Sequence, residues 1–131
     1  LTAVDVVLRH QSAVAGVQEL QPMITSFLGP PPSLSLRESA KYSSVRLCDW
    51  IWESSCTSAA ERTSSWSLTN YLRSDVHYYE WQFERVLENA VANGDTPLVE
   101  WLLTHFSGCM VPEEAVINAA IHGNVRILQM M

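Results

Sequence analysis

The chain has 131 residues, of which 47% are hydrophobic and 17% are charged, and its formal net charge is −6. This composition supplies enough apolar side chains for a folded core and excludes a disordered, highly charged segment. The excess of acidic over basic residues disfavours a broad nucleic-acid-binding surface, because nucleic acids present negatively charged phosphates. No apolar run reaches the roughly 18–20 residues that a membrane-spanning helix needs, so no membrane partner is expected.

The cysteines indicate the redox setting of the protein. Cys48, Cys56 and Cys109 are sparse and odd in number, which argues against a disulfide framework. Such usage is typical of a reducing compartment, so the predicted location is intracellular, in the cytoplasm. The chain begins at Leu1 rather than at a methionine, and the sequence therefore does not show whether a targeting segment precedes it.

The first third of the chain contains two helical patterns and a clear break. The first ten residues and residues 17–28 have apolar side chains at helical spacing. Three prolines in the stretch 28–33, LGPPPS, interrupt any helix and stiffen the connection. The sequence therefore predicts a helical N-terminal cap over residues 1–32 and a separate region over residues 33–131.

Two short helices and a loop are predicted after the prolines. One helix runs from Ser35 to about Tyr42 and the next from Ser44 to Trp52, and each begins at a serine that can cap its first turn. Residues 53–65 are small, polar and aperiodic, which predicts an exposed loop.

The strongest helical signal lies in the second half of the chain. A short helix is predicted over residues 66–74, and a longer one begins near His77. Gly94 is predicted to end this helix in a left-handed conformation, and Pro97 then lies in the first turn of its partner helix. The predicted apolar stripe of the long helix consists of Phe83, Val86, Leu87, Ala90 and Val91.

One segment of the sequence occurs more than once. The stretch Asn93–Leu103, NGDTPLVEWLL, recurs 29 positions later as His122–Met131, HGNVRILQMM. A weaker copy surrounds Ser43, and the polar loop and the predicted helix after it lengthen that unit. A single helix pair cannot cover both of its faces, so repeated pairs are predicted to stack on one another.

These repeated segments resemble a known structural repeat. NGDTPLVEWLL and NAAIHGNVRILQMM resemble the second half of an ankyrin repeat, whose consensus is A-A-x-x-G-H-x-x-V-V-x-L-L-L. Over residues 33–131 the chain is similar to the amino-terminal region of oomycete ankyrin-repeat-like protein families. The resemblance implies an all-α fold, an irregular ankyrin-like helical-repeat solenoid of stacked helix–turn–helix pairs that binds proteins.

The sequence also departs from the ankyrin pattern. Its period is 29 residues rather than about 33, and the T-P-L-H motif is missing from the first helix. The turn 107–112, SGCMVP, is too short for the projecting hairpin of that family. The binding site that ankyrin repeats build with this hairpin is therefore not expected in its usual form.

No catalytic, cofactor-binding or metal-binding set is predicted. The cysteines and the four histidines have no zinc-ligand spacing. Cys48 lies at the repeat position of Val99 and is expected in the core, Cys109 is expected to pack in a turn, and Cys56 is expected to be exposed.

Two arrangements of acidic residues have ordinary explanations. Glu80, Glu84 and Glu88 share one helical face, which could raise a carboxyl pKa for general acid catalysis, but a solvated face opposite the apolar stripe is favoured. Asp75 and His77 resemble part of a catalytic dyad, but no nucleophile accompanies them. The protein is therefore not expected to be an enzyme.

Aromatic residues are concentrated between residues 66 and 83, and an exposed group of this kind next to acidic residues is typical of an interface. The alternative is that the predicted helix at residues 66–74 folds back over the rings and buries them. The candidate partner-binding residues are Trp66, Tyr71, Tyr78, Tyr79 and Trp81.

These observations favour a non-catalytic protein–protein interaction scaffold whose protein partner the sequence does not identify. The alternative is a structural N-terminal capping segment of a longer repeat protein, or a regulatory region fused to a catalytic domain, with no binding site of its own. An uncovered apolar face is expected at the end of the chain, which predicts truncation and self-association through that face. Its expected members are Val125, Ile127, Leu128, Met130 and Met131.

Overall fold

Side-chain caps define where most of the helices begin. The computed structural model describes residues 28–131; the helix predicted over the first ten residues and all but the last residue of the helix predicted over residues 17–28 lie outside this range. In the described part, the Oγ of Ser35 accepts a hydrogen bond from the Glu38 amide at 3.1 Å, which satisfies a free donor of the first turn. Side-chain caps of this kind are made by Ser35, Ser44, Asp75 and Asp95.

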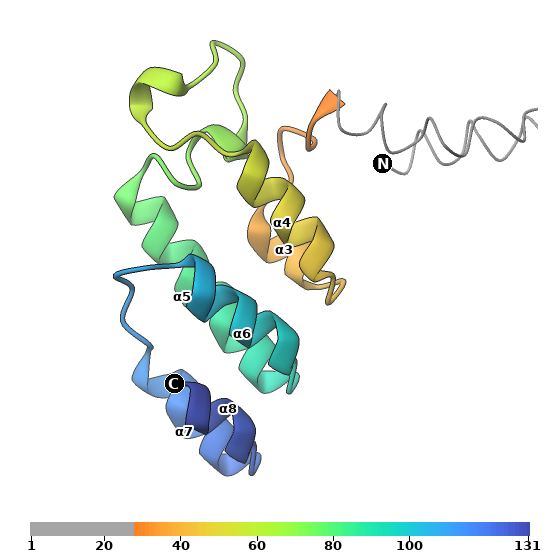
Figure 1. Ribbon diagram of the computed structural model, residues 1–131, viewed down its shortest axis with the longest axis vertical. Coiled ribbons are helices and arrows are strands. Elements are labelled where there is room, and N and C mark those ends of the chain that lie inside the picture. The colour runs from red at the N-terminus through yellow and green to blue at the C-terminus, as the bar shows by residue number, and fades with distance from the viewer. Residues whose placement is uncertain (1–27) are drawn as a thin grey trace, which may run out of the picture. The chain divides into compact units, whose positions relative to one another are not determined.

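The described residues contain six α-helices and no strand, so the all-α fold class is confirmed (Figure 1). Two short 3₁₀ turns, Ala59–Glu61 and Leu68–Asn70, lie between the second and third of these helices. The helices are α3 (Leu36–Ala40), α4 (Val45–Ser54), α5 (Val76–Ala92), α6 (Thr96–His105), α7 (Glu113–Ile121) and α8 (Val125–Met130).

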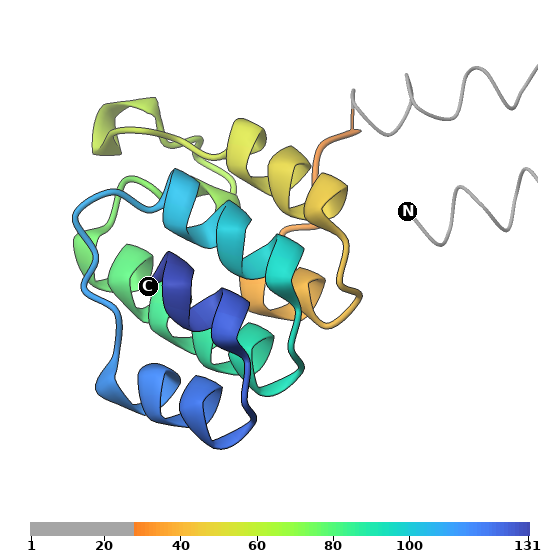
Figure 2. The same cartoon turned by 60° about the horizontal axis from the view of Figure 1, so that its bottom comes forward.

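The helices of the compact unit Pro32–Met131 form three antiparallel pairs in two layers. Helices α3, α5 and α7 pack side by side in one layer, and α4, α6 and α8 follow one another in the second layer (Figure 2). Each pair therefore rests on the pair before it, and the pair α5–α6 is covered on both sides.

The core lies between the two layers. All five residues of the predicted stripe of α5 are at most 2% exposed, as the helical spacing predicts. Helix α6 contributes Leu98, Val99 and Leu102 to the same core. Cys48 of α4 is also fully buried, which confirms its predicted core position. Ile127 of α8 is only 1% exposed, which corrects its expected place on an uncovered apolar face at the end of the chain.

The turns between paired helices are alike. Gly94 has a φ of +64°, as predicted for the left-handed residue after the first helix, and Gly123 has the same conformation at +65°. In the first pair the same place is taken by Ser43, whose φ is +49°. This is the one residue other than glycine with a positive φ within residues 28–131.

The hydrogen bonds of the two glycine turns also repeat at 29 residues. The amide of Asp95 donates to the carbonyl of Ala90 at 2.8 Å, and the amide of Asn124 donates to the carbonyl of Ala119 at 2.9 Å. The period that is visible in the sequence is therefore also a period of backbone conformation.

The segment between α4 and α5 differs from the prediction. The helix predicted over residues 66–74 does not form, and only the 3₁₀ turn Leu68–Asn70 and an irregular turn occur there. The Oγ of Ser74 donates to the carbonyl of Asn70, and the side chain of Asn70 bonds the preceding loop. Such side-chain bonds compete with the backbone bonds of a helix, which explains the error.

Candidate partner-binding surface

Tyr78 and Trp81 form a stacked pair of rings near the start of α5. The two residues are three positions apart and therefore share one side of the helix. Their ring centroids are 6.3 Å apart and their planes differ by 20°. Trp81 is 42% exposed, whereas Tyr78 is half-buried. A tryptophan this accessible can contact a second molecule.

Arg37 extends this aromatic pair onto the neighbouring helix. Its guanidinium carbon lies 6.0 Å from the ring centroid of Trp81, at the outer limit of a cation–π contact. Arg37 itself is exposed. The surface formed by Arg37, Tyr78 and Trp81 is called the Trp81 patch below.

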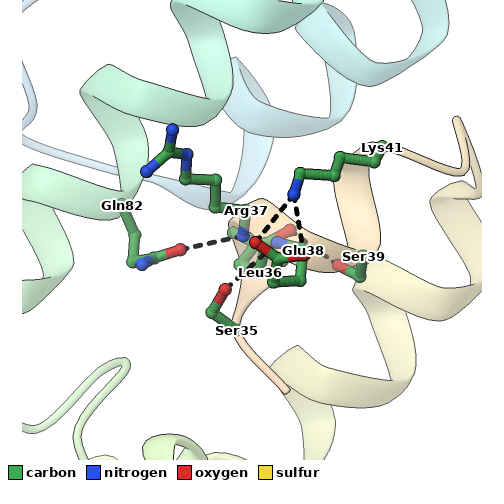
Figure 3. Close-up of polar contacts among 7 residues, drawn as sticks. All are labelled: Ser35, Leu36, Arg37, Glu38, Ser39, Lys41 and Gln82. Atoms are coloured by element: carbon green, nitrogen blue, oxygen red, sulfur yellow. Dashed lines mark hydrogen bonds and ion pairs between the residues drawn. The ribbon is translucent and has the colours of Figure 1, made fainter. Parts of the chain in front are cut away.

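Buried Gln82 sets the position of Arg37. Its side chain is fully buried, and its Oε1 accepts a hydrogen bond from the backbone amide of Arg37 at 3.0 Å (Figure 3). Figure 3 shows this side chain reaching from α5 to the first turn of α3, next to the cap at Ser35. The bond satisfies one of the free amides at the start of α3 and joins the two helices beside the Trp81 patch.

Sequence reasoning did not identify Gln82 or Arg37 as part of this surface. The available signal was a glutamine beside Phe83, at a position where the apolar stripe of α5 continues. A buried polar side chain needs a partner, and the partner here is a backbone amide that has no signature in the sequence. The Nε2 of Gln82 makes no hydrogen bond within the described residues.

Arg37 determines the charge of the Trp81 patch, because the two aromatic members are neutral at neutral pH. A tyrosine phenol is neutral at this pH, and desolvation raises the pKa of Tyr78 further, to about 12, because the phenolate form would lose its hydration. The guanidinium of Arg37 therefore provides the positive charge of the patch. Two rings beside a guanidinium suit a partner that presents an apolar side chain next to a carboxylate.

Tyr79 is directed away from the Trp81 patch and belongs to a packed group of rings. Its centroid lies 4.7 Å from that of Phe106, and its hydroxyl donates to the carbonyl of Ser107 at 3.3 Å. Burial is the largest cause of its raised pKa. The packed rings, called the aromatic cluster below, are Trp52, Tyr79, Phe83, Trp101, His105 and Phe106.

Polar contacts join α6 to α4 at one side of the aromatic cluster. The Nε1 of Trp101 donates to the carboxylate of Asp49 at 2.6 Å. The Nδ1 of His105 donates to the carbonyl of Trp101 at 2.8 Å, and its Nε2 lies 3.8 Å from the same carboxylate. These contacts orient buried rings and give the aromatic cluster a structural role.

An open hollow of about 400 Å³ lies next to the aromatic cluster, with Trp52, Tyr79 and Arg73 among its lining residues. The guanidinium of Arg73 lies 5.1 Å from the ring centroid of Trp52, but it is already engaged. Its Nε and Nη2 donate to the hydroxyl and the carbonyl of Ser55, at 2.6 and 2.7 Å. The hollow is therefore a weaker candidate than the Trp81 patch.

Trp66 and Tyr71 lie in the segment between α4 and α5. Trp66 is 61% exposed, so it does not cover the other rings as the alternative interpretation required. Tyr71 lies under the guanidinium of Arg62, whose carbon is 4.7 Å from the ring centroid. The five predicted partner-binding residues thus occupy different places, and the structure brings Tyr78 and Trp81 together as a stacked pair.

The loop predicted over residues 53–65 is held by specific hydrogen bonds. The Nδ2 of Asn70 donates to the carbonyl of Ser65 at 2.9 Å and to the hydroxyl of Thr63 at 3.1 Å. The Nε of Arg62 donates to the hydroxyl of Ser74 at 2.9 Å. The loop begins later than predicted, since α4 continues to Ser54. Its polar side chains bond the loop itself rather than only the solvent.

The three cysteines are free thiols in different surroundings. Burial raises the pKa of Cys48 and of Cys109, which favours the protonated thiol over the reactive thiolate. Cys109 is half-buried in its turn, as predicted. Cys56 is half-buried rather than exposed, because its thiol donates to the carbonyl of Glu61 at 3.3 Å inside the loop.

The acidic residues of α5 have the surroundings of a surface. Glu80 and Glu84 are exposed, and Glu88 forms an ion pair with Arg85 at 3.0 Å. The carboxylate of Asp75 accepts the amide of Tyr78 at 2.8 Å and caps the helix. Within residues 28–131, no group of three or more His, Cys, Asp or Glu side chains is arranged to hold a metal ion.

Comparisons with protein-family models, curated proteins and solved structures found no match to this chain. Among the helices of residues 28–131, none has both the length and the apolar character needed to span a bilayer.

Proposed function

We propose that this protein is a non-catalytic protein–protein interaction module built from ankyrin-like helix pairs. The regular packing of α3, α5 and α7 in one layer supports the solenoid part of this proposal. The repeated glycine turns support it further, because equal turns orient successive pairs alike. The three free thiols agree with a reducing, intracellular setting, which we include in the proposal.

The Trp81 patch is the observation that carries the binding function. It combines an exposed indole with a guanidinium, and tryptophan and arginine are the side chains that most often dominate interface energies. The patch lies on two helices that Gln82 joins, so a partner meets a preorganised surface and little side-chain entropy is lost on binding. By its chemistry, the partner is a protein with an apolar side chain beside a carboxylate.

One observation favours the alternative that the chain is a structural capping segment of a longer repeat protein. Tyr79 and the rest of the aromatic cluster are used for packing between α4, α5 and α6, which is the role of a scaffold. Under this alternative, the Trp81 patch would not bind a partner.

The binding proposal is tested with Trp81→Ala and with a control aromatic residue outside the patch. Proteins captured by the immobilised wild-type chain are purified, and their affinities for the wild type and the variants are measured by calorimetry. We expect Trp81→Ala to weaken binding by about 2 kcal/mol or more, as the loss of a central interface side chain does.

Tyr42→Ala is the matched control. Tyr42 is 74% exposed and follows Lys41, which lines a pocket together with Arg37 and with Asn93 at the far end of α5. That end lies roughly 18 Å along the helix axis from Trp81. Tyr42→Ala should therefore leave the affinity unchanged. Equal affinities of the Trp81→Ala and Tyr42→Ala variants would contradict a role for the patch, and the structural alternative would then be preferred.

A further inference from the structure

A small pocket of about 150 Å³ lies between the C-terminal ends of α3 and α5, and we call it the asparagine pocket below. Its lining residues include Arg37 and Lys41 on the side of α3, and Asn89 and Asn93 on the side of α5. The guanidinium of Arg37 is also the one that lies near the ring of Trp81. The asparagine pocket and the Trp81 patch therefore share a side chain and adjoin each other along α5.

Asn89 and Asn93 present their carboxamides on the side of α5 that faces α3. At 100° per residue, both lie within roughly 20° of Gln82 around the helix axis, and Gln82 bonds α3 directly. Helix α3 ends at Ala40, and both asparagines remain exposed. Within residues 28–131, no hydrogen bond engages either carboxamide. Each carboxamide therefore offers a free donor next to a free acceptor.

The charges around the asparagine pocket cancel. Arg37 and Lys41 are positive, and the Nζ of Lys41 is paired with the carboxylate of Glu38 at 2.8 Å. Asp95 also lines the pocket, and its Oδ1 accepts the amide of Leu98 at 3.3 Å. Two cations and two carboxylates leave no net charge that would attract an ion. The pocket therefore suits a neutral group that both donates and accepts hydrogen bonds.

A peptide group of a partner protein has this chemistry, because it carries one N–H donor and one C=O acceptor. Inside a helix both groups are already bonded to the helix itself, whereas an extended segment leaves them free. Asn93 lies roughly 18 Å from Trp81 along the axis of α5. An extended segment spans this distance with about five to six residues.

We propose that the partner binds as an extended segment that runs along α5 from the Trp81 patch to the asparagine pocket. Its apolar side chain contacts Trp81, and its carboxylate pairs with Arg37, whose guanidinium forms no ion pair within residues 28–131. A peptide group about five residues away bonds the carboxamides of Asn89 and Asn93. This inference rests on the proposed binding function of the Trp81 patch and specifies the conformation of the partner.

The probe is a library of random linear peptides that is selected on the immobilised 131-residue chain. The selected peptides should share an apolar residue next to an acidic one, and their affinities are measured by calorimetry. The double substitution Asn89→Ala and Asn93→Ala should weaken their binding about tenfold, because two hydrogen bonds are lost. Circular dichroism should show that the helix content of this variant is unchanged.

Peptides that are methylated at single backbone nitrogens test the same contact on the unchanged chain. One of these methyl groups, about five residues from the apolar side chain, should weaken binding to the wild type. The same methyl group should have no further effect on the variant that lacks Asn89 and Asn93, because both changes remove one interaction.

Asn118→Ala is the matched control. Asn118 lies 29 residues after Asn89, at the same repeat position in α7, and it does not line the asparagine pocket. Its substitution should leave the affinity unchanged. Tyr42 does not line the pocket either, so it stays a valid control for the Trp81 patch.

The outcomes separate this inference from the function on which it rests. Peptides whose binding depends on Trp81 but not on Asn89 and Asn93 would overturn the inference alone. Failure to select any linear peptide would do the same. Peptide binding that Trp81→Ala leaves unchanged would contradict the proposed function and the inference together.

Discussion

Leu102→Ala is expected to lower the free energy of unfolding by about 2–5 kcal/mol, the range for deleting a large buried aliphatic side chain. Leu102 lies in α6 and is fully buried in the core between the two helix layers. The pair α5–α6 has a neighbouring pair on each side, so the surrounding helices cannot easily collapse into the cavity. Denaturant melts monitored by circular dichroism measure the loss.

Leu103→Ala is the matched control for this substitution. Leu103 is the next residue of the same helix and is only partly buried, so the same truncation removes less apolar surface from the core. Its cost should be clearly smaller than that of Leu102→Ala. A loss below about 1 kcal/mol for Leu102→Ala would show that Leu102 is not a core residue.

Gly94→Val is expected to lower the free energy of unfolding by about 1–3 kcal/mol, because valine is strongly disfavoured at positive φ. The φ of Gly94 is +64°, and the atoms nearest to an added Cβ are those of the Asn124 side chain, at 3.8 and 4.0 Å. The added carbon would therefore make ordinary contacts, and the cost comes from the backbone conformation.

Ala92→Ser separates this backbone effect from a general effect of substitution near the turn. Ala92 is exposed at the end of α5, and a change there should stay within about 0.5 kcal/mol. Gly94→Ala should lie between the two, since alanine lacks the branched Cβ of valine. If thermal or denaturant melts show that Gly94→Val and Ala92→Ser lower the free energy of unfolding equally, the left-handed conformation of Gly94 is contradicted.

The elements with strong local signals were predictable from the sequence. The stripe of α5 repeats at helical spacing, and its end at Gly94 follows from a glycine between two periodic segments. The caps at Ser35 and Ser44 also follow from local chemistry. These features depend on residues within a few positions of one another, and sequence patterns record such contacts well.

The segment between α4 and α5 depends on longer-range bonds and was predicted poorly. Asn70 bonds Ser65 and Thr63, and Arg73 bonds Ser55 across 18 positions. No periodic pattern in the sequence predicts such hydrogen bonds. The helix predicted over residues 66–74 is therefore replaced by a turn whose side chains bond the loop.

The candidate site was predicted only in part for a related reason. Tyr78 and Tyr79 are neighbours in the sequence, but a rotation of about 100° per residue places them on different sides of α5. Tyr79 meets Phe106, whereas Tyr78 meets Trp81. Which side is buried depends on where α3 and α6 pack. The composition of the sequence does not give this information. For the same reason, the sequence did not reveal that Arg37 belongs to the patch.

The central claim of this account is that each helix pair is stabilised by the pairs on either side of it. Native-state hydrogen exchange of the chain, at a dilution where it is monomeric, tests this claim most directly. Amides from Phe83 to Leu103 lie in the pair that is covered on both sides, and they should exchange slowest. Amides from Val116 to Met131 lie in the pair α7–α8, which among the described residues packs against one neighbouring pair, and they should exchange faster. Equal protection of the two pairs in the monomer would contradict the account.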